Sequence, residues 1–380
     1  MTRNQVANYT IGLLRSVFEG QQPQEKPATI GFEEVYNFAK FHCVEGMVFY
    51  AIEQLQERPE PQLYQEWQAN RDGNIIKTMN QLAELESLSD LLTQAQIKHL
   101  PLKGSVLIHD YPQMDFRYLG DLDILVEADK TKEIYNLLLE RGAVNDDYGV
   151  TNHDSYLFDK GFYRIIVEIH RQLFDRTVPY ASYFDEEQLL SQFKSYRQEM
   201  SLEDFYVFMM AHFAKHFFKG GSGIRSVMDV HVFMEKYEEQ LDWDLVNGRL
   251  KQMELLDFDQ NARKLATIWF GQEAWSDDLE DLAQVVISQG AYGTFEHNVD
   301  NQLKAILEKN GSGLGGKLSY LWSRVFIERR FIQKGYPYTK RYPFLLPLGY
   351  GHRLVNGILK KRDRVKYELN SLVKSKNSDE

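Results

Sequence analysis

Two aspartates, Asp121 and Asp123, stand two residues apart in the apolar run Leu119-Gly-Asp-Leu-Asp-Ile-Leu-Val126. Because side chains i and i+2 of a β-strand point to the same face, the run predicts a strand that presents two neighbouring carboxylates. Carboxylates so placed repel each other and need a compensating cation, for which a hard divalent ion such as Mg²⁺ is the usual choice. The alternative is that both aspartates are caps at the edge of an ordinary strand.

A third carboxylate, Glu168, lies within Arg164-Ile-Ile-Val-Glu-Ile-His170, a second predicted strand. A charge among β-branched residues is costly unless it has a partner. Glu168 therefore fits the third carboxylate of a two-metal site, either as a metal ligand or as the general base on an acceptor hydroxyl. His170 shares its strand face. The alternative is a salt bridge from Glu168 to Arg164 or Arg171.

A strand-to-helix turn precedes the aspartates at Lys103-Gly104-Ser105. A tight glycine turn lets backbone N–H groups approach a triphosphate, and the start of the following helix favours negative charge. Ser105 would add a hydroxyl donor. Lys103 and Arg117 are candidate phosphate ligands, since triphosphate binding needs nearby cations. Otherwise both are solvated surface charges.

A third group of polar residues lies further along the chain. His212 and His216 have helical i, i+4 spacing that suits a metal, but no glutamate follows His212 as in zinc proteases. The alternative is hydrogen-bonding histidines on a helix face. Lys219-Gly-Gly-Ser-Gly-Ile-Arg225 reads as a turn between helices. In the functional interpretation this loop closes over a nucleotide, Arg225 contacts phosphate, and Asp229 steadies Arg225 from i+4.

Taken in order, these motifs resemble the polymerase-β-like nucleotidyltransferase superfamily, and more narrowly a bacterial family of uncharacterised nucleotidyltransferases. The resemblance covers roughly residues 30–235. The motifs that carry it are Leu102-Lys-Gly-Ser105, Tyr111-Pro112, Arg117, Asp121-Leu-Asp123 and Val167-Glu-Ile-His170.

The resemblance implies a role for each motif. Gly104 and Ser105 would bind nucleotide phosphates, Asp121 and Asp123 would bind metal, and Glu168 would be the third carboxylate. The resemblance also includes a His-His-Arg-Asp pattern. The residues of this pattern are candidates for lining the site: His212, His216, Arg225 and Asp229.

The implied activity is a Mg²⁺- or Mn²⁺-dependent transfer of NMP from an NTP such as ATP to an unidentified acceptor. The acceptor would be a hydroxyl of a small molecule, a sugar or a protein side chain. The acidic bulk of the chain argues against long nucleic acids. The alternative function is a catalytically degenerate nucleotide-binding protein, or a membrane-surface accessory or interaction protein.

The elements that must position these residues are predicted to form an α+β fold. We expect a helical N-terminal region (1–95), a nucleotidyltransferase core with a small mixed sheet (96–180), a larger helical region (181–335) and a basic Pro/Tyr-rich extension (336–380). Apolar periodicity predicts continuous helices over 2–19, 32–56 and 62–96, a helix over 298–309, an extended or looped segment at 336–350, and a basic amphipathic helix over 354–373.

Composition supports a folded, soluble, cytoplasmic protein, with 43% hydrophobic and 26% charged residues. The single cysteine, Cys43, excludes an internal disulfide and a cysteine zinc site and fits a reducing compartment. No apolar run suggests a signal peptide or membrane span.

The net charge of −11 is unevenly distributed. Residues 314–376 contain 15 Lys/Arg and only 3 Asp/Glu. This basic stretch is either a solvated face or a surface for phosphate, nucleic acid or an anionic membrane.

Overall fold

The computed structural model describes residues 4–161, 163–192, 194–219, 221–292, 299, 302–303, 306–307, 314–327 and 329–374. The chain divides into two compact units. The sheet unit comprises Met1–Phe217 and Ser222–Tyr292, and the C-terminal unit comprises Phe218–Gly221 and Gly293–Glu380. The four predicted regions remain a prediction, and the predicted helix at 298–309 lies largely outside the described residues.

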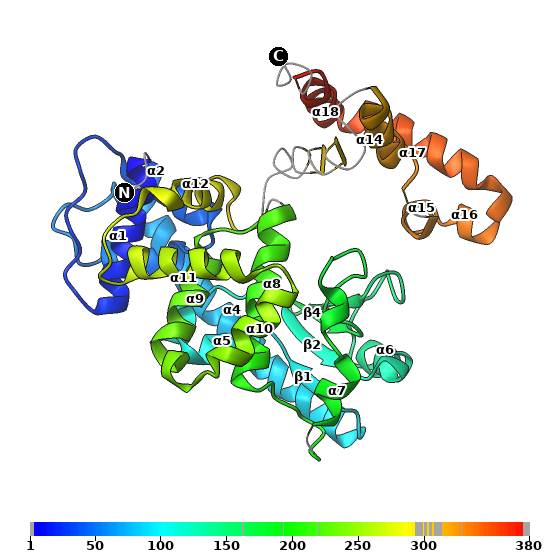
Figure 1. The fold of residues 1–380 in the computed structure, drawn as a ribbon, viewed down its shortest axis with the longest axis horizontal. Coiled ribbons are helices and arrows are strands. Elements are labelled where there is room, and N and C mark those ends of the chain that lie inside the picture. Colours follow the sequence, from blue (N-terminus) through cyan, green and yellow to red (C-terminus); the bar gives the residue numbers. More distant parts are fainter. Residues whose placement is uncertain are drawn as a thin grey trace. The chain divides into compact units, whose positions relative to one another are not determined.

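The sheet unit contains a mixed four-stranded sheet with the order β1-β2-β4-β3, of which Figure 1 labels β1, β2 and β4. The central strands β2 and β4 are parallel, while β1 pairs antiparallel with β2 and β3 pairs antiparallel with β4. The predicted α+β fold with a small mixed sheet is confirmed. The strands are β1 (His99–Pro101), β2 (Leu122–Val126), β3 (His153–Asp159) and β4 (Arg164–His170).

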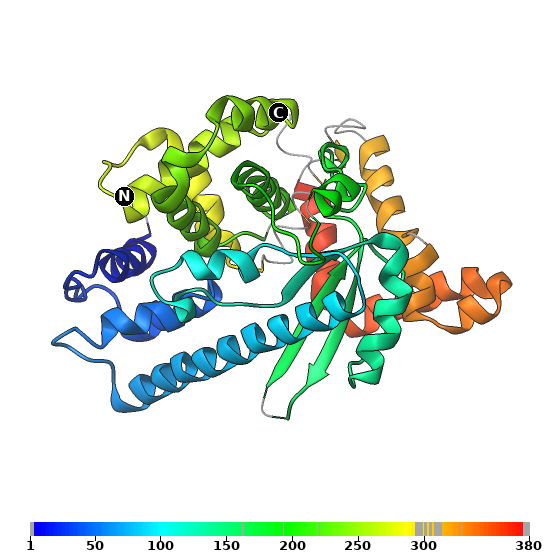
Figure 2. The same cartoon turned by 90° about the horizontal axis from the view of Figure 1, so that it is seen from below.

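The two faces of β2 differ in chemistry because its side chains alternate. Leu122, Ile124 and Val126 join a buried core with leucines of two helices, α4 (Pro61–Gln94) and α6 (Thr131–Glu140). Figure 2 shows α4 as the long blue-to-cyan helix beside the sheet. The opposite face of β2 carries Asp123 and Leu125, which belongs to the larger, mainly helical core, and Asp121 immediately precedes the strand. The site residues therefore face the helical part of the unit.

Three helices open the sheet unit: α1 (Gln5–Glu19), α2 (Phe32–Phe41) and α3 (Glu45–Ile52). The predicted continuous helix over 32–56 is wrong. The chain leaves the helix at Cys43, whose φ of +54° is left-handed. The buried His42 fixes this break, since its ring contacts the Ile287 carbonyl at 3.1 Å and accepts the Ile224 N–H at 3.2 Å.

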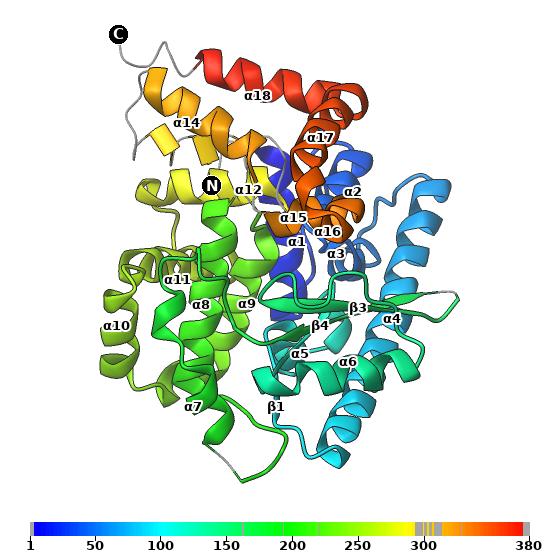
Figure 3. The same ribbon diagram turned by 90° about the vertical axis from the view of Figure 1, so that its right-hand side faces the viewer.

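Later helices complete the unit and pack back onto its beginning. α11 packs against both α1 and α9, so that segments far apart in sequence share the larger core. Figure 3 shows α8, α9 and α11 close together in this unit. These helices are α7 (Glu186–Ser191), α8 (Leu202–Lys219), α9 (Ile224–Tyr237), α10 (Trp243–Gln252), α11 (Leu256–Phe270) and α12 (Glu280–Gln289).

The described part of the C-terminal unit is helical. The predicted extended segment at 336–350 is wrong, because it contains α16, a 3₁₀ turn and the start of α17, where Pro347 occupies the tolerated first turn. The predicted helix over 354–373 is two helices that part at Lys361. The helices are α14 (Leu314–Val325), α15 (Arg329–Gly335), α16 (Tyr338–Arg341), α17 (Leu346–Lys360) and α18 (Arg362–Lys374).

A small core of Leu303, Tyr320 and Leu372 holds part of this unit together, and Arg324 forms an ion pair with Glu368. Within the described parts of both units, no helix combines the length and the apolar character needed to cross a membrane.

Candidate metal and nucleotide site

The register of the parallel pair β2 and β4 gathers three carboxylates. Asp123 and Glu168 are direct partners across the two strands, and Asp121 precedes Asp123 by two residues on the same face. Carboxylate oxygens of all three residues lie within 4.8 Å of one another. Oxygen donors in such a group suit Mg²⁺ or Mn²⁺. The structure thus brings together the three residues that the sequence singled out.

The charge of Asp123 is compensated within the protein. Its Oδ1 accepts hydrogen bonds from Lys103 Nζ and lies against His170 Nε2, both at 2.7 Å. Burial acts to raise the pKa of Asp123, but Lys103 and His170 outweigh it and hold this pKa far below its usual range. The same contacts, acting against burial, raise the pKa values of Lys103 and His170.

Asp121 lacks such compensation. It forms no ion pair with any described residue, and burial together with the charge of Asp123 raises its pKa to about 6. A divalent cation held by these oxygens would offset the repulsion between the two aspartates. This is the electrostatic reason that the residues fit a metal.

Glu168 lies between two histidines rather than beside an arginine. Its carboxylate oxygens are 3.3 Å from His170 Nε2 and 3.5 Å from His153 Nε2. The expected alternative, a salt bridge to a nearby arginine, is wrong, since Arg164 pairs with Asp159 and Arg171 with Asp154.

A second histidine, His153, lies beside the carboxylates. It is the cross-strand partner of His170, and the two ring centroids are 4.9 Å apart. Burial lowers its pKa. With Glu168, the two histidines form a second group whose ligand atoms lie within 4.8 Å. Only the register of β3 on β4 reveals this proximity, because His153 and His170 are 17 positions apart in the sequence, with a hairpin turn between them.

The Lys103-Gly104-Ser105 turn connects β1 to the four-residue helix α5 (Gly104–Leu107). Lys103 has a φ of +51°, an uncommon conformation for a side-chain-bearing residue, and this places its ammonium on Asp123. Gly104 has no room for a side chain, because a Cβ would overlap the guanidinium of Arg117. The buried Ser105 hydroxyl has no hydrogen-bond partner among the described residues.

Arg117 and Asp229 form a buried bidentate ion pair. Arg117 donates from Nε and Nη2 to the two Asp229 oxygens, each at 2.8 Å, and the Tyr111 hydroxyl donates to Oδ1 at 2.7 Å. Asp229 therefore steadies Arg117, and the expected partnership with Arg225 is wrong. The two parallel N–H···O bonds require the guanidinium to approach the carboxylate edge to edge in one plane, and Arg117 does so from the loop before β2.

Two other cations border Asp121 without an acidic partner among the described residues. Lys77 Nζ, from α4, donates to the Tyr118 hydroxyl at 2.9 Å and the Leu119 carbonyl at 3.0 Å. Arg225 Nη1 donates to the Tyr118 carbonyl at 3.2 Å. The pKa of Lys77 is lowered by burial, against the opposing charges of Cys43 and Asp121. No sequence pattern marked Lys77, which lies amid polar residues of a long helix.

His212 and His216 contact each other, with their Nε2 atoms 3.0 Å apart on α8. Burial, followed by the positive charge of Lys103, pushes the pKa of His212 far below its usual value, and His170 acts in the same sense. The imidazole of His212 thus lies within electrostatic reach of the carboxylate group. Its role as a site-lining residue remains a prediction.

A four-stranded mixed sheet that presents three carboxylates beside a Lys-Gly-Ser turn is the arrangement expected of a nucleotidyltransferase. The comparison with protein families agrees. The family model described as "Uncharacterised nucleotidyltransferase" matches residues 28–271. The chain belongs to this family. Neither the curated proteins nor the solved structures contain a significant match.

The close approach of Arg117 makes Gly104 a sensitive position. Gly104→Ala should destabilise the protein by about 1–3 kcal/mol, because the guanidinium is fixed by Asp229 and cannot move aside freely. Gly73→Ala is the control, since its Cβ would meet nothing within 4 Å inside α4. That substitution should stabilise by about 0.5–1 kcal/mol. Urea unfolding of both variants measures this, and equal effects would contradict the packing argument.

The two aspartates should respond oppositely to neutralisation in metal-free buffer. The pKa of Asp121 is raised from 3.8 to about 6, so its ionisation penalty is complete above about pH 6 and disappears as the pH falls towards 3.8. Asp121→Asn should therefore stabilise the protein at about pH 8, by about 1–3 kcal/mol, and by less than half as much at about pH 4.5.

Asp123→Asn supplies the matched comparison. The lowered pKa of Asp123 means that its charge stabilises the fold at every pH above the unfolded value of 3.8. Its loss should cost about 3 kcal/mol at both pH values, because Lys103 and His170 lose a buried partner. Thermal unfolding with a chelator present tests both variants, and the same sign for the two at about pH 8 would refute the uneven compensation.

Proposed function

We propose that this protein is a Mg²⁺- or Mn²⁺-dependent nucleotidyltransferase that moves NMP from an NTP to an acceptor hydroxyl. The observation that carries the proposal is the meeting of Asp121, Asp123 and Glu168 on one face of β2 and β4. Membership of a nucleotidyltransferase family supports the reaction class.

The three carboxylates would hold the metal, which supplies charge neutralisation to the phosphates during transfer. The acceptor oxygen forms a bond to the α-phosphorus, the bond from that phosphorus to the bridging oxygen breaks, and pyrophosphate leaves. Glu168 either takes the proton of the acceptor hydroxyl or serves as a metal ligand. Lys103 and His170 keep Asp123 ionised and oriented, so that its carboxylate is ready to bind.

For the triphosphate we propose Lys77 and Arg225 as the principal cations. Both lie within electrostatic reach of Asp121, and neither forms a direct ion pair with a described acid. Lys103 and Arg117, by contrast, already hold Asp123 and Asp229. Lys103 therefore acts through Asp123, and Arg117 acts by filling the space beside Gly104.

The turn itself offers Ser105 as a hydrogen-bond donor to phosphate. Its hydroxyl is buried beside Gly104 without a described partner, and an unpaired buried hydroxyl is costly unless a ligand satisfies it. The acceptor is a small molecule, a sugar or a protein side chain. Long nucleic acids fit poorly with a net charge of −11.

A catalytically degenerate nucleotide-binding protein is the alternative. The presence of all three carboxylates in one group disfavours it, since binding alone does not require them.

Isotope position distinguishes nucleotidyl transfer from other uses of an NTP. Wild-type protein incubated with cell lysate, Mg²⁺ or Mn²⁺ and each NTP should transfer label from the α-phosphate and not from the γ-phosphate. The double variant Asp121→Ala/Asp123→Ala should lose more than about a hundredfold of this activity. Asp129→Ala, which removes an exposed carboxylate just after β2, should be unaffected. Transfer of γ-label, or equal transfer by the double variant, would overturn the proposal.

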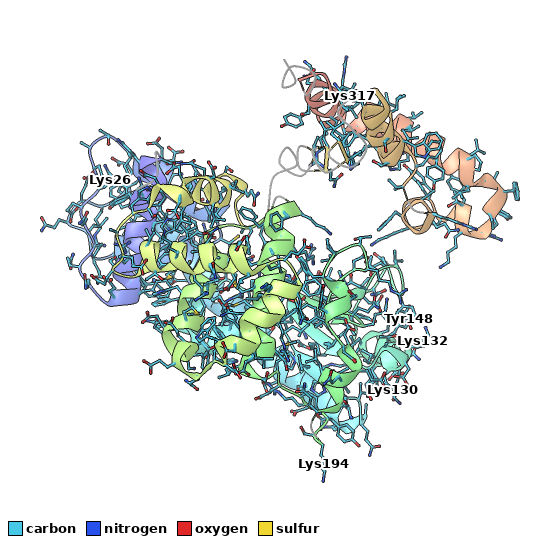
Figure 4. All side chains as sticks on the ribbon, viewed as in Figure 1. Lys26, Lys130, Lys132, Tyr148, Lys194 and Lys317 are labelled. Carbon is cyan, nitrogen blue, oxygen red and sulfur yellow. The ribbon has the colours of Figure 1, made fainter. Side chains whose placement is uncertain are left out.

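The triphosphate assignment has its own test. Lys77→Met and Arg225→Met should each weaken binding of Mg²⁺-NTP about tenfold, or about 1.4 kcal/mol, by removing one charged contact. Lys77 Nζ lies over the Tyr118 ring, 4.3 Å from its centroid. Lys132→Met is the control, because Lys132 Nζ on α6 lies in the same way 4.0 Å from the Tyr135 centroid; Figure 4 labels Lys132. Calorimetric titration measures the affinities. A larger loss for Arg117→Met with unchanged folding would reverse the assignment.

A further inference from the structure

The C-terminal unit exposes an unusual amount of apolar surface. More than half of the large apolar side chains that are exposed in the described chain fall within residues 318–369. Phe344 is 77% exposed, Leu359 is 74% exposed and Trp322 is 66% exposed. Isolated exposed apolar residues are ordinary, but a dense group of them marks a surface that contacts something else.

Four exposed apolar residues of α17 and the turn before it lie in a row, which we call the α17 stripe, while Leu354, 39% exposed, lies to one side of it. The α17 stripe consists of Phe344, just before the helix, and Leu348, Val355 and Leu359 within it. Spacings of four, seven and four residues place all of these on one side of a helix with 3.6 residues per turn.

The other side of α17 is occupied within the same unit. A Cβ at Gly349 would overlap the side chains of Ile332 and Thr339, and Arg353 Nη1 donates to the Arg324 carbonyl at 2.7 Å. Asn356 also donates to the Tyr336 hydroxyl at 3.2 Å. The side of α17 that packs within the unit therefore includes polar contacts, while the apolar α17 stripe is exposed. This is the reverse of the usual arrangement, in which the apolar side of a helix is buried.

A second apolar row lies on α14. Leu318, Leu321 and Trp322 are exposed at i, i+3 and i+4, while Tyr320 between them is buried. The Trp322 ring is tilted against Phe326 with the centroids 4.2 Å apart, and the Phe326 centroid is 5.5 Å from that of Tyr350 on α17. Aromatic contacts thus link the two rows within this unit.

Positive charge flanks the α17 stripe at both ends. Lys340 and Arg341 precede it, and Lys360, Lys361 and Arg362 follow it. All five are exposed, and none forms an ion pair with another described residue. The surrounding segment 314–376 has 15 Lys/Arg and 3 Asp/Glu in a chain of net charge −11. This separation of charge favours a negatively charged partner for this unit.

We propose that the C-terminal unit is a docking surface for an anionic lipid membrane. The α17 stripe enters the boundary between headgroups and acyl chains, and the two flanking basic groups bind lipid phosphates. Apolar residues bordered by lysine and arginine are typical of helices that lie in the plane of a membrane. Clustered cations of this kind select anionic lipids and lose their effect as salt rises. This inference is independent of the reaction proposed for the sheet unit.

The full chain should sediment with vesicles of phosphatidylcholine mixed with phosphatidylglycerol, and not with phosphatidylcholine vesicles. Leu348→Glu/Leu359→Glu and Lys360→Glu/Lys361→Glu/Arg362→Glu should each lower the bound fraction about tenfold, by removing the apolar and the electrostatic contribution respectively. High salt should act like the charge variant. The matched controls are Leu245→Glu, an exposed leucine of α10, and Lys130→Glu/Lys132→Glu near α6, which should bind like wild type.

Failure of the wild type to bind anionic vesicles, or equal binding by the substituted and control proteins, would overturn the proposal. The other two candidate occupants of the stripe are the sheet unit and a second copy of the chain. Light scattering and hydrogen exchange on the same variants detect those occupants. A dimer that Leu348→Glu/Leu359→Glu dissociates, without vesicle binding, would likewise overturn the membrane assignment. The charge variant alters exposed side chains only, so that its result stands even if the apolar variant folds poorly.

Discussion

Mutual repulsion among three carboxylates on two adjacent strands is the constraint on which the rest of the site depends. The register that pairs Asp123 with Glu168 fixes the carboxylates close together, and the protein neutralises only part of the resulting charge. Lys103 and His170 serve Asp123, whereas Asp121 has no comparable partner among the described residues. An apo site with this imbalance is preorganised for a cation, because binding one removes an existing electrostatic cost.

The neighbouring elements take their positions from this constraint. The sheet turns its apolar face towards α4 and α6, and that packing fixes α4 beside the strand that carries the aspartates. The same helix then delivers Lys77 to the backbone and hydroxyl groups just before Asp121. A single helix thereby combines a structural and an electrostatic task. The carboxylate group attracts cations, whereas the basic C-terminal unit, a separate part of the chain, attracts anions.

The sequence was informative where the signal is local. Alternation in the strand containing Asp121 and Asp123, and the position of Glu168 among β-branched residues, predicted both strands and the three carboxylates. The pairing between strands could not be predicted from the sequence. The proximity of His153 to Glu168, for example, depends on the register of β3 on β4. Lys77 and the Arg117–Asp229 pair are brought in by contacts between distant segments.

Helix breaks were hard to predict for a related reason. Apolar periodicity continues across Cys43, yet the tertiary contacts of His42 stop the helix there. At 336–350 the prolines and aromatic residues suggested an irregular segment, but Pro347 falls in the first turn of a helix, where proline is tolerated.

The bidentate pair beside the glycine turn has a consequence for how such a chain can evolve. Arg117 requires the bare backbone of Gly104 on one side and the carboxylate of Asp229, shared with Tyr111, on the other. These four positions lie on separate segments of the chain, but a substitution at one of them changes which residues the others tolerate. A substitution at any one of them should be tolerated only with compensating substitutions at the others. Related sequences should therefore either keep all four residues or replace them together.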